Sequence, residues 1–344
     1  MNRLRFAMIG CGRISRKHVE ALAANGAAAA LAAVCDIVPG RAAEASRAYA
    51  ERMPGGKAPA ACLDYRHMLG EQGLDAVAVC VESGRHAEVA LDCLRSGLHV
   101  LVEKPMALSS GDAEAMISLA GQNGLRLGVC HQNRFNPPIQ RLRRALDEGR
   151  FGKLVNGTVR VLWNRDAGYY SQAPWRGTWK LDGGTLMNQC IHGIDLLQWM
   201  MGGAPETVMG MTGRFLRDIE AEDFGAAIMR FGNGSIGIVE GSACVYPENL
   251  EETLGIFGET GAAVIGGMAV DRVQTWRFAD LREYDGETRD PEIIDVYGNG
   301  HSPLYADFIS AVRDGRDPYI SGKDGKIALD IVLRVYAQEG HSCG

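Results

Sequence analysis

The chain of 344 residues is 46% hydrophobic, so it can bury two cores of ordinary domain size. Its formal net charge of -6 provides no basic surface, which argues against nucleic acid or an anionic membrane as a partner. Its nine cysteines include no Cys-x-x-Cys pair, and no apolar segment is long enough for a signal peptide or a membrane span, so we expect a reduced cytoplasmic protein without a metal site.

The first part of the chain alternates short apolar runs with helical patterns, which predicts parallel strands joined by crossover helices. The expected strands are Leu4–Gly10, Leu31–Asp36, Ala60–Leu63, Ala76–Val81, His99–Val102 and Leu127–His131. The expected helices are one that ends near Ala24, Pro39–Met53, Tyr65–Leu69, His86–Arg95 and Asp112–Gln122. We therefore predict an α/β protein whose residues 1–132 form a Rossmann domain with a doubly wound parallel sheet.

The pattern changes after a helix that begins at Asn136-Pro137. From Val155 to Trp163, apolar and polar residues alternate with the period of a half-buried antiparallel strand. Two helical patterns, the first beginning at Ser302-Pro303, close the chain. We predict that residues 133–344 form an α+β domain with an open, mainly antiparallel sheet, whose final helix can pack back on the first domain. Two β-hairpins are expected in it, Phe224–Phe231 with Ser235–Val239 and Leu254–Phe257 with Ala262–Ile265.

A glycine-rich turn follows the first strand and opens a helix. Gly10 makes this turn, and Gly12 lets a pyrophosphate approach the backbone at the helix N-terminus, beside Arg13 and Ile14. Asp36 ends the second strand, where a carboxylate can accept both hydroxyls of the adenine ribose. These features predict NAD as the cofactor, because the 2′-phosphate of NADP would face a like charge. The nearby Arg41 is the feature that favours NADP.

Two histidines of this domain have more than one interpretation. His18 lies between Ile14 and Leu22 on one helical stripe, which favours a packed histidine over a ligand. His86 begins a helix near the expected nicotinamide half of the cofactor. Contact with the cofactor and a capping role both remain open for His86.

A charged pair ends the apolar run that begins at His99. The sequence there is Glu103-Lys104-Pro105, so the pair lies at the carboxyl edge of the sheet, where ligands of such folds bind. The proline is compatible with a cis peptide bond. The alternative to a reactive lysine is an ordinary ion pair at a strand terminus.

A second polar cluster follows the glycine pair Gly183-Gly184. Asn188, His192 and Asp195 stand at i, i+4 and i+7, which predicts one polar stripe on a helix. A histidine with carboxamide and carboxylate neighbours suits general acid–base catalysis, whereas the alternative is a stripe that faces water.

Arginines and aromatic residues gather in a short irregular stretch from Arg165 to Trp179. Rings and guanidinium groups suit a sugar ring, a uracil or a phosphate, so we predict substrate binding here. The alternative is a surface loop pinned by its tryptophans. The candidate substrate-binding residues of this stretch are Arg165, Tyr170, Trp175 and Arg176.

The order of these motifs resembles the Gfo/Idh/MocA oxidoreductases over nearly the whole chain. The motifs are Gly10–Ser15, Glu103-Lys104-Pro105, Gln132-Asn133 and Gly183–Asp195. The resemblance implies an open sheet that is used for oligomerisation, hence a homodimer or homotetramer. It places Lys104 and His192 beside the nicotinamide. It also implies cofactor-binding roles for Glu103 and Gln132, and substrate-binding roles for Asn133, Arg134, Asn188 and His192.

A narrower set of motifs resembles the bacterial UDP-N-acetyl-glucosaminuronate 3-dehydrogenases, which serve surface-polysaccharide synthesis. This resemblance implies a nucleotide-sugar substrate oxidised at C3, and it allows 2-oxoglutarate as a second substrate that recycles the cofactor. The motifs include Gln132-Asn133-Arg134, Tyr169-Tyr170, Trp175-Arg176-Gly177, Met187-Asn188-Gln189, Ile219–Asp223, Tyr246-Pro247 and Tyr297-Gly298.

Two positions depart from the wider family. Asn188 stands where many members have Asp, so this neighbour of His192 cannot stabilise an imidazolium by charge. Val81-Glu82 stands where Thr-Pro is common, which places the Glu82 carboxylate near the nicotinamide half and adds Glu82 to the cofactor-binding candidates.

The predicted reaction oxidises a secondary hydroxyl of a sugar. Its proton passes to His192 while Lys104 donates a hydrogen bond to the same oxygen, or the two residues exchange these roles. Two rival interpretations remain open. One is a dehydrogenase of free sugars or inositols in catabolism, and the other is a regulator that binds NAD without chemistry.

Overall fold

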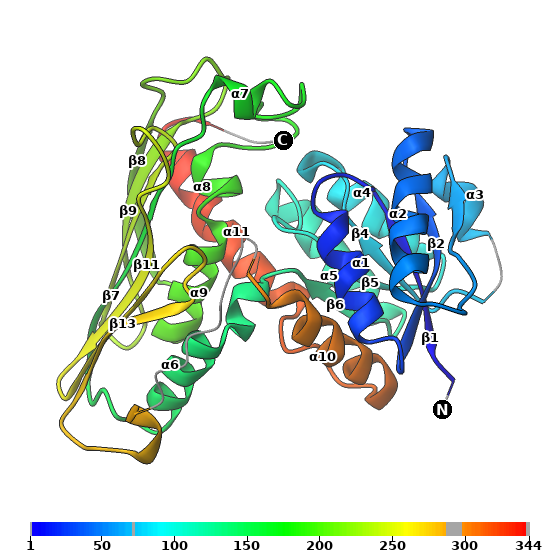
Figure 1. The fold of residues 1–344 in the computed structure, drawn as a ribbon. Helices are drawn as coiled ribbons and strands as arrows, with labels where there is room; N and C mark the ends of the chain where they lie inside the picture. Colours follow the sequence, from blue (N-terminus) through cyan, green and yellow to red (C-terminus); the bar gives the residue numbers. More distant parts are fainter. Residues whose placement is uncertain (1, 71–72, 287–297, 342–344) are drawn as a thin grey trace. The chain divides into compact units, whose positions relative to one another are not determined.

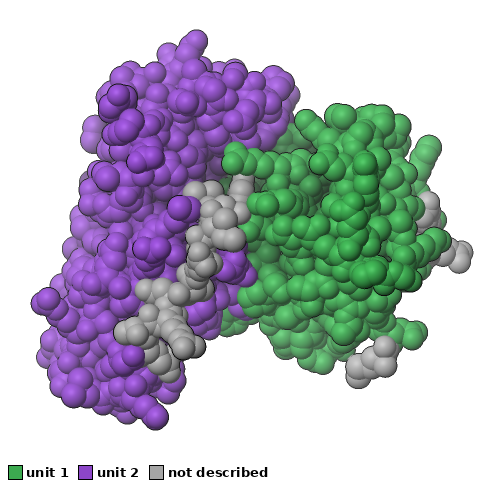
Figure 2. All heavy atoms as spheres, viewed as in Figure 1, with its two compact units in different colours: residues 1–131, 301–326 green, residues 132–300, 327–344 purple. Residues whose placement is uncertain are grey.

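The computed structural model describes residues 2–70, 73–286 and 298–341. Tyr297 of the last motif and one of the nine cysteines, Cys343, therefore lie outside the described residues. The chain divides into two compact units: unit 1 comprises residues 1–131 and 301–326, and unit 2 comprises residues 132–300 and 327–344 (Figure 2). Among the described residues, no helix has both the length and the apolar character that a membrane span requires.

Unit 1 is built on a six-stranded sheet with the order β3-β2-β1-β4-β5-β6, in which every neighbouring pair is parallel. Its strands are β1 (Leu4–Ile9), β2 (Ala29–Cys35), β3 (Ala60–Cys62), β4 (Ala76–Val79), β5 (His99–Val102) and β6 (Leu127–Val129). The helices that join them are α1 (Ser15–Ala24), α2 (Pro39–Arg52), α3 (Tyr65–Leu69), η1 (Ser83–Arg85), α4 (His86–Arg95) and α5 (Ser110–Gln122). The predicted doubly wound Rossmann sheet is confirmed.

Burial and glycine stops explain why these elements form where they do. All four residues of β4 are buried, as a strand covered on both faces requires. Gly97 and Gly124 follow α4 and α5 with φ angles of 77° and 65°, a conformation that glycine adopts without steric cost.

A distant segment completes unit 1. Helix α10 (His301–Asp314) packs against α1, and Ser321 forms an isolated antiparallel bridge with Gly128 of β6 (Figure 1). A Cβ on Gly128 would lie 2.9 Å from the ring of Phe308, so glycine is needed where α10 approaches the sheet.

Unit 2 contains a seven-stranded sheet with the order β13-β12-β11-β7-β10-β9-β8. Among the described strands of this second sheet, only β7 and β10 pair in parallel, so the prediction of a mainly antiparallel sheet is confirmed. Both predicted hairpins are present, as β9 with β10 and β11 with β12. The strands are β7 (Leu154–Leu162), β8 (Thr207–Gly213), β9 (Phe224–Arg230), β10 (Ile236–Ser242), β11 (Glu251–Gly258), β12 (Gly261–Gly266) and β13 (Arg272–Phe278).

Helices of unit 2 lie along one face of this sheet, with α9 packed against β7, β10 and β11 (Figure 1). Gly193 of α9 faces Val159 of β7, and a Cβ on Gly193 would lie only 2.6 Å from the valine side chain. The helices of unit 2 are η2 (Gln132–Phe135), α6 (Pro137–Asp147), α7 (Ala167–Tyr170), α8 (Thr185–Asn188), α9 (Ile191–Met201), η3 (Glu283–Gly286) and the larger part of α11 (Gly322–Gln338).

The opposite face of the seven-stranded sheet carries exposed apolar side chains. Met209, Ile228 and Ile238 stand in register on three neighbouring strands and are 66%, 47% and 42% exposed. Such a row of apolar side chains on an open sheet face is typical of a surface that another protein covers.

Candidate active site

The glycine loop connects β1 to α1 at the carboxyl edge of the unit 1 sheet. Gly10 has a φ of 93°, and a Cβ there would overlap with the Cys80 carbonyl, so only glycine fits. A Cβ on Gly12 would meet nothing within 4 Å. This open space lies next to the N-terminus of α1, whose partial positive charge attracts an anion. The loop therefore fits the pyrophosphate of NAD.

Asp36 follows β2 and lies against the glycine loop. Its Oδ2 accepts a hydrogen bond from the Cys11 N–H at 2.8 Å, and its Oδ1 accepts one from the Val38 N–H at 2.8 Å. The carboxylate thus stands at the edge where the adenine ribose is expected. Two exposed apolar residues beside it, Ile37 and Leu63, were not among the predicted site residues. The signal that could have found them is an apolar residue within two positions of the end of each strand, where an adenine ring would need an apolar surface.

Lys104 lies in a turn directly after β5. Its main-chain N–H donates to Glu103 Oε2 at 3.2 Å, and the Lys104–Pro105 peptide is cis. On the other side of the lysine, the Pro105 carbonyl lies 2.7 Å from His86 Nδ1, while His86 Nε2 lies 2.9 Å from the Val81 carbonyl. Burial lowers the pKa of His86, whereas the two carbonyl groups, which only accept hydrogen bonds, act in the opposite direction.

These contacts bear on the two interpretations of His86. The residue is the first of α4, and its ring contacts carbonyl groups of two loops at the carboxyl edge. The neighbouring Glu82 is half-buried and lies 3.9 Å from the Arg85 guanidinium.

Nine of the predicted site residues therefore follow strand ends of one sheet. They are Gly10, Gly12, Arg13, Ile14, Asp36, Glu82, His86, Glu103 and Lys104.

The polar stripe predicted for Asn188, His192 and Asp195 is wrong. The segment forms two helices, and Asn188 ends α8 whereas His192 belongs to α9. The break occurs where the Gln189 and Cys190 N–H groups both donate to the Thr185 carbonyl, at 2.9 and 3.0 Å. His192 is half-buried, whereas Asp195, three residues further along α9, is fully buried.

Asp195 has an arginine partner inside unit 2. Arg134 in η2 donates to both carboxylate oxygens, from Nε at 2.7 Å and from Nη2 at 2.6 Å, and both side chains are almost fully buried. This bidentate pair ties η2 to α9. Gln132 and Asn133 of the same short helix are also buried. A structural role thus accounts for the burial of Arg134, and its contact with a substrate stays a prediction.

The arginine and aromatic residues of the irregular stretch meet at Tyr169, which was not among the predicted substrate-binding residues. The Arg165 and Arg176 guanidinium carbons lie 5.1 and 4.2 Å from the centre of its ring, and Tyr170 packs edge-on against it. Gln189 Nε2 donates to the Tyr169 hydroxyl at 3.3 Å. The repeated proximity of arginine and tyrosine in the sequence was the available signal for this cluster.

Asp182 links this cluster to α8. One carboxylate oxygen accepts a hydrogen bond from the Asn188 side chain, and the other accepts from the Gly177 N–H at 2.7 Å. The Asn188 side chain therefore donates a hydrogen bond to Asp182, a residue that was not predicted as part of the site.

A cavity of about 430 Å³ opens beside the irregular stretch. The buried Nε of Arg176 has no hydrogen-bond partner among the described residues. Arg176 also lines this cavity, and a guanidinium group beside a cavity of this size suits an anionic group of a small molecule. The cavity is lined by Ala167, Tyr170, Ser171, Ala173, Pro174, Arg176, Leu216, Arg217, Asp218 and Ile219.

Comparison with known proteins agrees with this geometry. A family model for the oxidoreductase family with an NAD-binding Rossmann fold matches residues 4–131, and the GFO/IDH/MocA C-terminal domain model matches residues 139–264. The chain is also 27% identical to inositol 2-dehydrogenase of Rhizobium meliloti, over 98% of each chain.

Two solved structures are similar over almost the whole chain. The WlbA dehydrogenase of Bordetella pertussis, in complex with NADH and UDP-GlcNAcA, is 36% identical, with a TM-score of 0.86 over 99% of this chain and 98% of that one. The WlbA dehydrogenase of Chromobacterium violaceum, with the same ligands, is 36% identical, with a TM-score of 0.88 over 99% and 95%. The chain therefore belongs to the Gfo/Idh/MocA family of NAD-dependent oxidoreductases.

Proposed function

We propose that the protein oxidises a secondary hydroxyl of a UDP-linked N-acetylated uronate, namely C3 of UDP-N-acetyl-glucosaminuronate, in the synthesis of surface-polysaccharide sugars. The observation that carries this proposal is the cluster around Tyr169, where two guanidinium groups contact one ring beside a cavity. A diphosphate and a sugar carboxylate are the anions such a cluster recognises, and a neutral polyol has neither. The similarity to two dehydrogenases solved with UDP-GlcNAcA supports it further.

The chemistry is the removal of a hydride from the carbon and of a proton from its hydroxyl oxygen. When bound, NAD⁺ supplies the hydride acceptor. His192 takes the hydroxyl proton, and Lys104 donates a hydrogen bond to the oxygen as negative charge develops on it. The products are the 3-keto sugar, NADH and one proton. In the exchanged assignment, Lys104 is the base and His192 is the donor.

The rival substrate class is a free sugar or an inositol. The 27% identity to inositol 2-dehydrogenase, over nearly the whole chain, supports this alternative class. It differs from the proposal in needing no recognition of a nucleotide, so it predicts that the arginines at Tyr169 do not affect turnover.

The test is NADH formation, followed by absorbance, with UDP-N-acetyl-glucosaminuronate, UDP-N-acetylglucosamine, myo-inositol and levoglucosan. We expect turnover with the uronate, weak or no turnover with the uncharged nucleotide sugar, and none with the free polyols. Because a ketone product can hold the reaction back, each reaction is repeated with 2-oxoglutarate, which takes the hydride from NADH, and the 2-hydroxyglutarate formed is then measured in place of NADH. Turnover of inositol but not of the nucleotide sugars would refute the proposal and leave the family assignment intact.

A further inference from the structure

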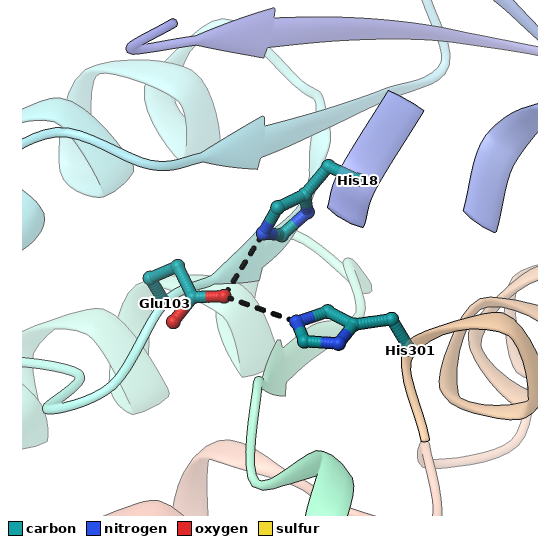
Figure 3. A group of neighbouring side chains, drawn as sticks. All are labelled: His18, Glu103 and His301. Atoms are coloured by element: carbon teal, nitrogen blue, oxygen red, sulfur yellow. Dashed lines mark hydrogen bonds and ion pairs between the residues drawn. The ribbon is translucent and has the colours of Figure 1, made fainter. Parts of the chain in front are cut away.

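A carboxylate held by two histidines is buried directly before Lys104 in the chain (Figure 3). His18 Nε2 lies 2.9 Å from Glu103 Oε1, and His301 Nε2 lies 3.7 Å from the same oxygen. The three side chains are 0%, 9% and 4% exposed, in the order His18, Glu103, His301. The reaction as derived above uses none of these three groups.

Three parts of unit 1 build this cluster. His18 comes from α1, Glu103 follows β5, and His301 begins α10. Tyr305 stands one helical turn after His301, and its hydroxyl lies 2.7 Å from His18 Nδ1. The His18 ring therefore has a partner on each nitrogen, and the contact with Tyr305 fixes its orientation toward Glu103.

The surroundings make Glu103 the negative charge of the cluster. Burial raises the pKa of a carboxyl, but the hydrogen bond from His18 and the contact with His301 outweigh it and hold the pKa of Glu103 well below its usual range. Burial also raises the pKa of Cys80, Cys130 and Tyr305 well above their usual values, so these facing groups stay neutral.

The remaining charged groups are basic. Burial lowers the pKa of His301, the contact with Glu103 raises it, and the nearby Lys17 lowers it. His86 interacts electrostatically with Glu103 and with Lys104, whose main-chain N–H donates to Glu103. Glu103 is thus a buried carboxylate next to histidines and Lys104.

The two carboxylate oxygens of Glu103 have different partners. Oε1 faces the two imidazole rings, while Oε2 accepts the hydrogen bond of the Lys104 main-chain N–H at 3.2 Å. We propose that Glu103 is a positioning residue for the dehydrogenation: His18 and His301 orient its carboxylate, which fixes the main chain of Lys104 and helps to retain the proton on that lysine. The inference rests on the proposed function only through the role of Lys104.

Two histidines and a glutamate are also a donor set that Zn²⁺ accepts. The distance of 2.9 Å between His18 Nε2 and Glu103 Oε1 is an ordinary N–H···O hydrogen-bond length. The phenol on the other ring nitrogen completes a hydrogen-bonded chain. The geometry therefore favours direct contact between imidazole and carboxylate, and metal binding becomes an outcome that the experiment can show.

The decisive experiment measures the pKa of Lys104 in the full-length protein without any sugar substrate. The lysine is labelled with acetic anhydride over a range of pH, and mass spectrometry gives the labelled fraction. Since a nearby negative charge favours the ammonium form, Glu103→Gln should lower this pKa by about one unit. Glu114→Gln, which removes an exposed carboxylate from the same unit, should leave it unchanged. An unchanged pKa in folded, NAD-binding Glu103→Gln would overturn the proposal.

A second pair of variants separates positioning from packing. His18→Gln keeps an N–H donor that can reach the carboxylate, whereas His18→Leu removes it. With whichever substrate the wild-type protein oxidises, we expect His18→Gln to keep at least ten times more turnover than His18→Leu. The limb of the pH–rate profile that Lys104 controls should move to lower pH in Glu103→Gln.

Two results count against the proposal, and a third concerns the substrate alone. Equal losses in both His18 variants, without a change in the pH profile, would mean that the cluster only packs. Thermal stabilisation by Zn²⁺ that disappears in His301→Gln would assign the cluster to a metal. If the wild-type protein oxidises polyols but no nucleotide sugar, the proposed substrate is refuted, and the lysine labelling result stays valid.

Discussion

In unit 1 the site residues follow the ends of parallel strands, whereas in unit 2 they lie on an irregular stretch and on short helices. The glycine loop and Asp36 are held by main-chain geometry and main-chain hydrogen bonds. The residues around Tyr169 are held by contacts between side chains. Strand ends of a Rossmann sheet can serve many dehydrogenases, because they bind the dinucleotide cofactor that these enzymes share. Side-chain clusters are easier to change without altering the fold, so substrate choice should reside in unit 2.

The largest effect should come from the two residues assigned to the chemistry. We expect Lys104→Ala to abolish most turnover and His192→Asn to lower it by roughly two to four orders of magnitude, the usual worth of a positioned proton acceptor. NAD affinity, measured by calorimetry, should change little because the pyrophosphate and adenosine contacts lie elsewhere. Lys57→Ala, on the exposed surface of unit 1, is the control. Near wild-type rates in both variants would refute this assignment.

Arg176→Met tests the claim that unit 2 selects the substrate. The loss of one charge-assisted contact of about 1.5–3 kcal/mol should raise KM for the UDP-sugar by roughly 10-fold to 100-fold, with NAD affinity unchanged. Steady-state kinetics at saturating NAD gives the comparison, and the exposed Arg277→Met serves as the control. If KM for the UDP-sugar stays within twofold of wild type, the Tyr169 cluster does not bind the nucleotide sugar.

Asp36→Ser tests the corresponding claim for unit 1. The wild-type protein should bind NAD at least ten times more tightly than NADP, because the carboxylate accepts the ribose hydroxyls and repels a 2′-phosphate. The variant should narrow that gap, whereas Glu51→Gln on α2 should not. Calorimetry with both cofactors measures it, and equal wild-type affinities would contradict the ribose argument.

Glu222 makes the stability of unit 2 depend on pH. Burial raises the pKa of Glu222 from 4.5 to about 8, although the Leu186 N–H and the Tyr336 hydroxyl favour its charged form. The folded state therefore binds this proton more tightly than the unfolded state. Its contribution to stability is complete below pH 4.5 and is lost as the pH rises through about 8.

Glu222→Gln, which mimics the neutral acid, should lose less thermal stability between pH 5 and pH 9 than the wild-type protein. Differential scanning calorimetry measures the difference, with the exposed Glu248→Gln as control. Parallel stability curves for Glu222→Gln and wild type would mean that Glu222 does not titrate in this range.

The smallest effect on turnover should come from the open sheet face of unit 2. We expect a homodimer or homotetramer that covers Met209, Ile228 and Ile238. Light scattering at micromolar protein should return a multiple of 37.1 kDa, and Ile238→Asp should lower the mass. Leu281→Asp, an exposed apolar position outside the sheet, should not. A wild-type mass near that of one chain would refute the expectation.

Much of unit 1 could be predicted from the sequence because its determinants are local. The apolar runs that become β4 and β6 are buried on both faces, and glycines stand where a turn needs a positive φ, as at Gly10. Asp36 and Lys104 directly follow strands, so their place at the carboxyl edge follows from the strand assignment. The hairpins of unit 2 were equally local, since each joins neighbours in the chain.

Tertiary structure decided what depends on residues far apart in the sequence. The break between α8 and α9 separates Asn188 from His192, and Asp195 is buried because Arg134, 61 residues earlier, reaches it. His18 and Tyr305 are in hydrogen-bond contact across 287 residues. Periodicity reports the face of an element that is buried, but it carries no record of the partner that covers it, because long-range contacts form only when whole elements pack. The histidine cluster next to Lys104 could therefore be found only in the folded chain.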